Sequence, residues 1–193
     1  MSITLLPRSG YVTKPWKNGA GQTDEIYLLP ADASRDAFDL RISSAPINER
    51  SAFSGFDGVD RAITLIEGSR LDLDFGSWTE MLKPLTPYSF DSTLAPIGSP
   101  GSENVRVINV MVNRRSGRLE KVRRITVEEQ LSPDCGGLIA IFALAPAEIV
   151  SQDKERHTLS RFDTAVLKGE IAQLIPSAKG ALIYEVSTKP APR

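Results

Sequence analysis

Histidine is almost absent from this chain, which has a single one, His157, among its 193 residues. A metal centre held by three histidines therefore cannot form within one chain. His157 also ends a polar run that begins at Ser151, and such a run is typical of an exposed turn. The sequence accordingly predicts that the protein binds no metal ion.

Cysteine is equally scarce, because Cys135 is the only one. A lone cysteine forms no disulfide within its chain and is typical of a reducing compartment. No stretch approaches the roughly 18 apolar residues of a membrane-spanning helix. The N-terminal sequence MSITLLPRSG also lacks the apolar segment of a secretory signal. The sequence therefore predicts a cytoplasmic protein that does not enter a membrane.

A surplus of positive charge is missing too, since Lys and Arg number 23, Asp and Glu number 24, and the net charge is −1. A nucleic-acid-binding protein usually has a basic surplus or a basic stripe. The one basic cluster, at residues 114–124, is more typical of a solvated hairpin than of a contact with RNA or DNA. Glycine-rich nucleotide-binding motifs and the GxSxG turn of hydrolases are also absent. We therefore expect neither a nucleic-acid partner nor a cofactor.

What the chain does contain is a series of short β-rich segments separated by turn residues. Polar and apolar residues alternate along some segments, and others are almost continuously apolar, as in strands covered on both faces. Prolines fall between the segments, where they mark strand starts, edges and connections. The sequence therefore predicts an all-β fold of the sandwich, jelly-roll or barrel type, with strands at 62–66, 70–75, 105–112, 138–144 and 181–186.

A weak internal repeat relates the two halves of the chain. When the first half is laid over the second, Leu65 falls on Phe142 and Leu82 falls on Leu159. All-β chains show such overlaps by chance, so one interpretation is that the overlap is a coincidence. The other is a pair of stacked β-barrels that share one continuous core.

The segment Trp16–Ile26, WKNGAGQTDEI, combines two glycines with several polar side chains. Glycine permits positive φ angles and close approach of the backbone. If a strand begins just after the glycines, Thr23 and Glu25 point to the same face. Together with Asn18 they would form a polar interior wall. The alternative is a glycine loop in which the Asn18 side chain bonds to its own backbone.

Two arginines lie in otherwise apolar strand segments, Arg61 in RAITLI and Arg41 in FDLRIS. Arginine is rarely buried without a partner, and its planar guanidinium matches a carboxylate. Two arginines that point into one barrel would form a trap for a carboxylate. The alternative is a pair of rim arginines that pair with Asp57, Asp60 or Glu67.

Aromatic residues in β-barrels usually belong to the core, which is where we expect Phe53, Phe56 and Phe90. Tyr88 has two interpretations, core residue or pocket residue, because its hydroxyl needs a partner if the ring points inward. We therefore retain Tyr88 as a candidate ligand-binding residue.

Four segments, in this order, resemble the HutD/Ves family: WKNGAGQTDEI, RISSAPINERSAFSGFDGVDRAITLIEG, LKPLTPYSF and VRVINVMVNR. They cover residues 12–115, and the rest of the chain matches only in its general pattern. One departure is Asp57, which stands where the family pattern has a proline. The resemblance implies a bicupin, in which two jelly-roll barrels form one compact unit, the first at residues 12–115 and the second at 116–193.

The resemblance also implies a metal-free small-molecule-binding protein that senses or modulates histidine utilisation. Relatives that match Ves are linked instead to a stress response. Formylglutamate-like or urocanate-like intermediates are the expected ligands. The resemblance places the strand at 105–112 beside the WKNGAGQTDEI strand, so that two further side chains join the pocket. The expected ligand-binding residues are Asn18, Thr23, Glu25, Arg41, Arg61, Tyr88, Asn109 and Met111.

Functions of different classes remain open at this point. The protein can be a sensor that binds a small acidic metabolite, with no catalysis. It can instead be an isomerase, epimerase or hydrolase that uses Glu25 as a general base, although a nearby Arg61 would oppose the raised pKa that such a base needs. It can also be a regulator that binds another protein and has no ligand. The lack of a usable nucleophile weighs against the enzyme, and a homodimer is compatible with each alternative.

Overall fold

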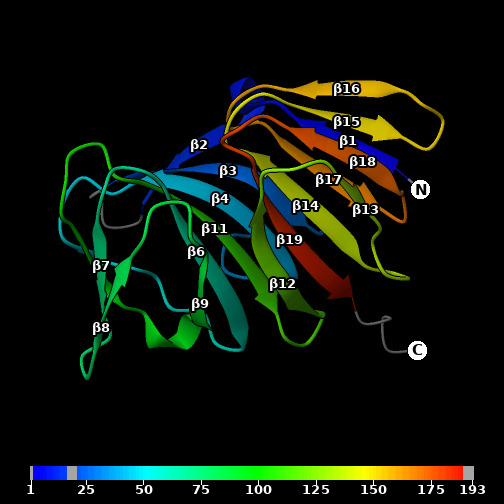
Figure 1. Ribbon diagram of the computed structural model, residues 1–193. Coiled ribbons are helices and arrows are strands. Elements are labelled where there is room, and N and C mark those ends of the chain that lie inside the picture. The colour runs from blue at the N-terminus through cyan, green and yellow to red at the C-terminus, as the bar shows by residue number, and fades with distance from the viewer. Residues whose placement is uncertain (1, 17–20, 189–193) are drawn as a thin grey trace. The chain divides into compact units, whose positions relative to one another are not determined.

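A computed structural model describes residues 2–16 and 21–188, and nearly all regular structure in these ranges is β-strand (Figure 1). The helical elements in these ranges are two short 3-10 turns, η1 (Arg8–Gly10) and η2 (Ser92–Leu94). None of the helices in the described ranges has the length and apolar character needed to cross a membrane. The chain is all-β with antiparallel sheets, which confirms the fold class predicted from the sequence.

The chain divides into two compact units. The first unit is Val12–Arg115, and the second unit combines Met1–Tyr11 with Ser116–Arg193. The N-terminal strand β1 (Ser2–Leu6) belongs to the second unit because it pairs with β17 (Thr164–Lys168) along its whole length. Each unit contains one larger and one smaller sheet.

In the first unit, a hydrophobic core joins the two sheets. Ile63 and Leu65 of the larger sheet and Leu71 and Leu73 of the smaller sheet belong to one cluster, and each is 0% exposed. The 6-stranded sheet has the order β2 (Val12–Pro15), β3 (Gln22–Leu29), β4 (Leu40–Pro46), β11 (Arg106–Asn113), β6 (Val59–Glu67) and β9 (Tyr88–Asp91). The 4-stranded sheet has the order β5 (Ser51–Ala52), β10 (Ile97–Pro100), β7 (Leu71–Asp74) and β8 (Thr79–Leu82).

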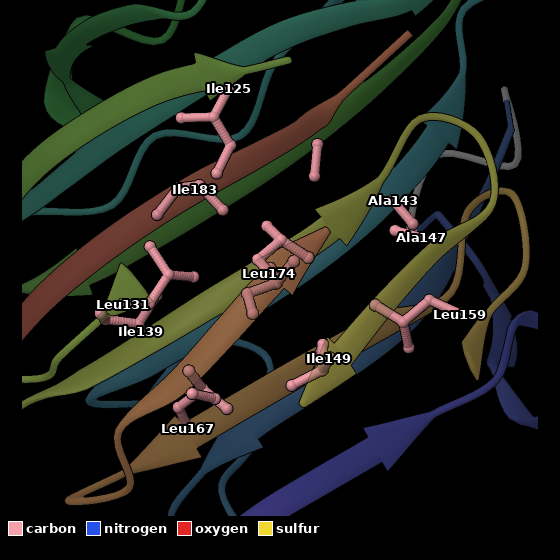
Figure 2. Close-up of a cluster of buried hydrophobic side chains, with 14 residues drawn as sticks. Ile125, Leu131, Ile139, Ala143, Ala147, Ile149, Leu159, Leu167, Leu174 and Ile183 are labelled. Carbon is pink, nitrogen blue, oxygen red and sulfur yellow. The ribbon is translucent and has the colours of Figure 1, made fainter. Parts of the chain in front are cut away.

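The second unit has a core of the same kind. Figure 2 shows apolar side chains, among them Ile139, Ile149, Leu174 and Ile183, that project between the strands of its two sheets. The 5-stranded sheet has the order β1, β17, β14 (Leu138–Ala143), β19 (Ala181–Thr188) and β12 (Gly117–Ile125). The 4-stranded sheet has the order β13 (Glu129–Leu131), β18 (Ala172–Pro176), β15 (Ala147–Ser151) and β16 (Arg156–Leu159).

The two units repeat one strand order. The order β4-β11-β6-β9 in the first unit recurs as β12-β19-β14-β17 in the second, and β5-β10-β7-β8 recurs as β13-β18-β15-β16. Core residues at cross-strand pairs fix the alignment, in which Leu65 corresponds to Ile141 and Val107 to Ile183. The sequence overlay placed Leu65 on Phe142 instead. A shift of one residue along a strand exchanges its two faces, so the overlay aligns opposite faces of β6 and β14.

Candidate functional site

A cavity of about 570 Å³ opens in the first unit. Ligand pockets usually enclose roughly 300–1,000 Å³, so the cavity has room for a small metabolite. We term its buried residues the floor and its more exposed residues the mouth. The floor consists of Thr23, Arg41, Ser43, Ala45, Ile47, Arg61 and Asn109, and the mouth includes Trp16, Arg35, Asp36 and the segment 51–57.

Strand register explains why polar side chains reach this floor. Asn109 of β11 lies directly opposite Ser43 of β4 on one side and Ile63 of β6 on the other. The expectation that this strand lies beside the WKNGAGQTDEI strand is wrong, because β4 separates β11 from β3. Residues that pair across neighbouring strands project from the same face of a sheet. Because Ile63 belongs to the core of the first unit, Asn109 and Ser43 also face the interior. The floor is therefore a polar continuation of the core face.

Arg61 is held by neutral groups. Its Nε donates to Oδ1 of Asn109 at 3.1 Å, and its Nη1 donates to the backbone oxygen of Ser54 at 3.2 Å. Its guanidinium carbon lies 5.1 Å from the centre of the Phe53 ring and 5.9 Å from that of Phe90. No carboxylate pairs with Arg61 among the residues that the structure describes. The arginine thus keeps a positive charge that its surroundings do not neutralise.

Burial, followed by the nearby charge of Arg41, lowers the pKa of Arg61 to about 9. Both effects disfavour the protonated guanidinium, and a bound anion would favour it. Arg61 is only 5% exposed, so it is not a rim residue. Of its alternative partners, Asp60 pairs with Arg114 and Glu67 lies 3.5 Å from Arg106, while Asp57 lines the mouth. The interpretation of Arg61 as a rim arginine paired with one of these acids is wrong.

Arg41 differs from Arg61 because it has an acidic partner. Its Nε donates to Oε2 of Glu25 at 3.0 Å, and its Nη2 donates to Oε1 of the same carboxylate. Both side chains are buried. Glu25 does not line the cavity, and both of its oxygens face Arg41. Glu25 therefore neutralises Arg41, and only one of the two arginines in the expected trap remains available to an anion.

Thr23 also lies on the floor, where its Oγ1 accepts a 2.7 Å hydrogen bond from Nε1 of Trp16. This bond orients the indole ring at the mouth, and the hydroxyl proton of Thr23 has no acceptor among the described residues. Asn18, the remaining polar candidate from the same segment, lies outside the described residues.

Besides Glu25, two more of the expected ligand-binding residues do not line the cavity. Met111 faces the interior but is 0% exposed, because it packs in an apolar cluster with Phe38 and Val59. Tyr88 lies on β9, at the edge of the 6-stranded sheet, and its ring stacks on Phe90 with the centroids 5.9 Å apart. Both residues support the core around the cavity and do not form part of its lining.

The mouth of the cavity contains aromatic rings that the sequence did not predict to lie there. Phe53 and Phe56 were predicted to lie in the core, yet they are half-buried and line the cavity together with Trp16. Phe53 fits because residue 98 is a glycine, where an added Cβ atom would lie 2.5 Å from Cε2 of the ring. A glycine within a strand often marks such a close approach, and Gly98 is the signal that could have identified this wall.

The chemistry of the floor suits an anion and not a cation. Among the described residues, no group of at least three His, Cys, Asp or Glu side chains is arranged to hold a metal ion. His157 lies on β16 of the second unit, with its Nε2 3.9 Å from Oε2 of Glu155. Guanidinium, amide and hydroxyl donors recognise carboxylates and similar anions.

Arg61→Met is expected to raise the free energy of unfolding of the unliganded protein by about 1–3 kcal/mol. A base whose pKa is lowered on folding binds its proton more weakly in the folded state, so its charge opposes folding at neutral pH. This opposition is relieved only as the pH rises above the folded-state pKa of about 9. Urea denaturation at pH 7 measures the effect. Arg41→Met is the matched control and should lower stability, because it leaves Glu25 without its partner; stabilisation by both changes would contradict the assignment.

Comparisons with known proteins agree with this architecture. The sequence model of the HutD family matches residues 8–184. Protein Ves of Citrobacter koseri is 40% identical over 102 residues, which cover 51% of this chain and 52% of the relative. The match therefore spans about half the length of this curated relative.

Solved structures extend the likeness over almost the whole chain. HutD from Pseudomonas fluorescens SBW25 is 22% identical with a TM-score of 0.80, over 98% of this chain and 100% of the other. A cupin 2 conserved barrel domain protein from Leptotrichia buccalis is 10% identical with a TM-score of 0.56, over 98% of each chain. Because the family model covers most of the sequence and the fold is shared with a cupin barrel protein, the chain belongs to the HutD family and has a cupin fold.

Proposed function

We propose that the protein binds a small acidic metabolite in the cavity of its first unit and acts as a metal-free sensor or modulator of histidine utilisation, without catalysing a reaction. The observation that carries this proposal is the burial of Arg61 without an acidic partner among the described residues. A buried guanidinium on the floor of a cavity, with no carboxylate partner among the described residues, is a site prepared for an anion.

The site offers enough interactions for useful affinity. A charge-assisted hydrogen bond to a carboxylate contributes about 1.5–3 kcal/mol. The rings of Trp16, Phe53 and Phe56 provide apolar walls for the rest of the ligand. Two charge-assisted bonds and partial burial of the ligand on these walls are consistent with micromolar binding, about 8 kcal/mol.

Membership of the HutD family supports the role in histidine utilisation. The ligands expected from that role, formylglutamate-like and urocanate-like compounds, each carry a carboxylate that Arg61 can bind. Such a role belongs in the cytoplasm. We also propose that each unit is one cupin barrel, which would make the chain a bicupin.

The contacts of Glu25 argue against the enzyme alternative. A general base needs a free lone pair within reach of the substrate proton. Both oxygens of Glu25 accept hydrogen bonds from Arg41, and the residue does not line the cavity. A sensor needs no such base, so the geometry favours binding over catalysis.

The test is a thermal-shift screen with N-formyl-L-glutamate and urocanate, followed by titration calorimetry. A ligand at about 100 times its dissociation constant should stabilise the protein by roughly 2.7 kcal/mol. Proton NMR of each acid after overnight incubation with the protein should show no conversion. Conversion of either acid would support the enzyme alternative, and failure of both to bind would favour a regulator that acts through another protein.

A further inference from the structure

The amide group of Asn109 has a defined orientation. Its Oδ1 accepts the hydrogen bond from Nε of Arg61 at 3.1 Å. Arginine nitrogens are donors only, so the amide oxygen must face Arg61 and the amide nitrogen must point away. Nδ2 of Asn109 has no acceptor among the described residues, and Asn109 lines the cavity. Its two N–H groups are therefore available to a ligand.

The same is true of other floor groups. Nη2 of Arg61 has no acceptor among the described residues, since the hydrogen bonds of this side chain come from Nε and Nη1. The hydroxyl of Ser43 lies on the strand next to Asn109 and can donate. Thr23 receives a bond from Trp16 and keeps its own proton. Asn109 Oδ1 and Thr23 Oγ1 already accept hydrogen bonds from Arg61 and Trp16, and the carboxylates that line the cavity, Asp36 and Asp57, lie at the mouth, so the floor itself presents mainly donors.

We propose that Asn109 determines which ligands this site accepts: it leaves Arg61 unneutralised and adds its own N–H groups, so that the floor binds a carboxylate and rejects the neutral amide of the same shape. This inference rests on the proposed function, because it concerns the same cavity. An amide ligand would place N–H donors against donors, whereas both oxygens of a carboxylate can be satisfied.

The second unit shows the effect of an acid at this position. Asn109 pairs with Ile63, and the corresponding pair in the second unit is Glu185 with Ile139. Glu185 forms an ion pair with Arg123 at 3.3 Å, and Nη1 of Arg123 also donates to Glu129 at 2.7 Å. Hydrogen bonds between Arg123 and Glu129 raise the pKa of the arginine and lower the pKa of the carboxyl.

Arg123, Glu129 and Glu185 form a charged triad, and their positions correspond to positions that line the cavity in the first unit. By strand register, three cavity positions of the first unit correspond to members of the triad: Ala45 to Arg123, Ser51 to Glu129 and Asn109 to Glu185. In the second unit these positions are therefore filled by charges that pair with one another. In the first unit Ala45 and Asn109 stand in place of Arg123 and Glu185, so no ion pair fills these positions, and Arg61, which has no counterpart in the triad, keeps its charge for a ligand.

Asn109→Asp tests the inference with almost no change in size. The new carboxylate would pair with Arg61, as Glu25 pairs with Arg41, and would repel an anion. We expect binding of N-formyl-L-glutamate or urocanate, whichever the wild type binds, to weaken by at least about thirtyfold in titration calorimetry. The matched control is Asn113→Asp, at the end of the same strand and outside the cavity lining, which should bind as the wild type does.

A second measurement uses the wild-type protein, so it does not depend on the folding of a variant. Urocanate is compared with urocanamide, and N-formyl-L-glutamate with its diamide. The acids should bind at least about tenfold more tightly than the amides. Equal binding of acid and amide, or unchanged binding by Asn109→Asp, overturns the role of Asn109 and leaves the proposed function standing. If neither acid binds the wild type, both proposals fail.

Discussion

Arg61→Ala is expected to weaken the binding of an acidic ligand by about 2–4 kcal/mol, a loss of roughly thirtyfold to thousandfold. The reason is that Arg61 is the one floor arginine without an acidic partner among the described residues. The fold should survive, because removal of this side chain enlarges a cavity that water already reaches. Titration calorimetry with N-formyl-L-glutamate and urocanate measures the change.

Arg61→Lys serves as the graded comparison. An ammonium keeps the charge but lacks the planar fork, so only part of the affinity should return. The bond from Nε to Asn109 depends on the guanidinium and would be lost, while the cation–π contact with Phe53 would change its geometry. Equal affinity of the wild type and Arg61→Ala would remove Arg61 from the binding site.

Glu25→Ala is expected to lower the free energy of unfolding by about 3–5 kcal/mol, which is typical when one partner of a buried ion pair is removed. Arg41 would then be buried without a carboxylate, close enough to Arg61 to affect its pKa. Two unneutralised guanidinium groups would share one cavity. Chemical denaturation at pH 7 and low salt measures the loss.

The double variant Glu25→Leu with Arg41→Met is the control for this prediction. It removes both charges and replaces them with apolar side chains, so most of the lost stability should return. Glu25→Gln keeps the shape of the side chain without its charge and should lie between the two. Wild-type stability of Glu25→Ala would show that the ion pair does not support the fold.

The fold class and the importance of Arg41 and Arg61 could be predicted from the sequence, because each depends on a local pattern of residues. Strand β14 is an almost continuous apolar run, and β7 alternates with period 2, so each is visible without knowledge of its neighbours. Arg41 and Arg61 are conspicuous because charge is rare in such strands. These features depend only on a residue and its nearest neighbours in the chain.

Other features depend on contacts between distant segments and could not be predicted. The ion pair between Glu25 and Arg41 forms because β3 pairs with β4. Met111 lies on the same face of β11 as Asn109. It does not reach the cavity only because Phe38 and Val59 pack against it. The basic cluster at 114–124, expected as a solvated hairpin, contains most of β12, a strand of the 5-stranded sheet.

The hydrogen bond between Trp16 and Thr23 gives ligand binding an expected fluorescence signal. The chain has two tryptophans, and only Trp16 lines the cavity. Trp78 is 45% exposed and stacks on Phe75 with the ring centroids 4.7 Å apart. In a Trp78→Phe background, the emission would come from one indole whose N–H is bonded to the floor of the site. A carboxylate that reached Thr23 would alter that bond, so the emission of Trp16 would follow occupancy in solution without a label.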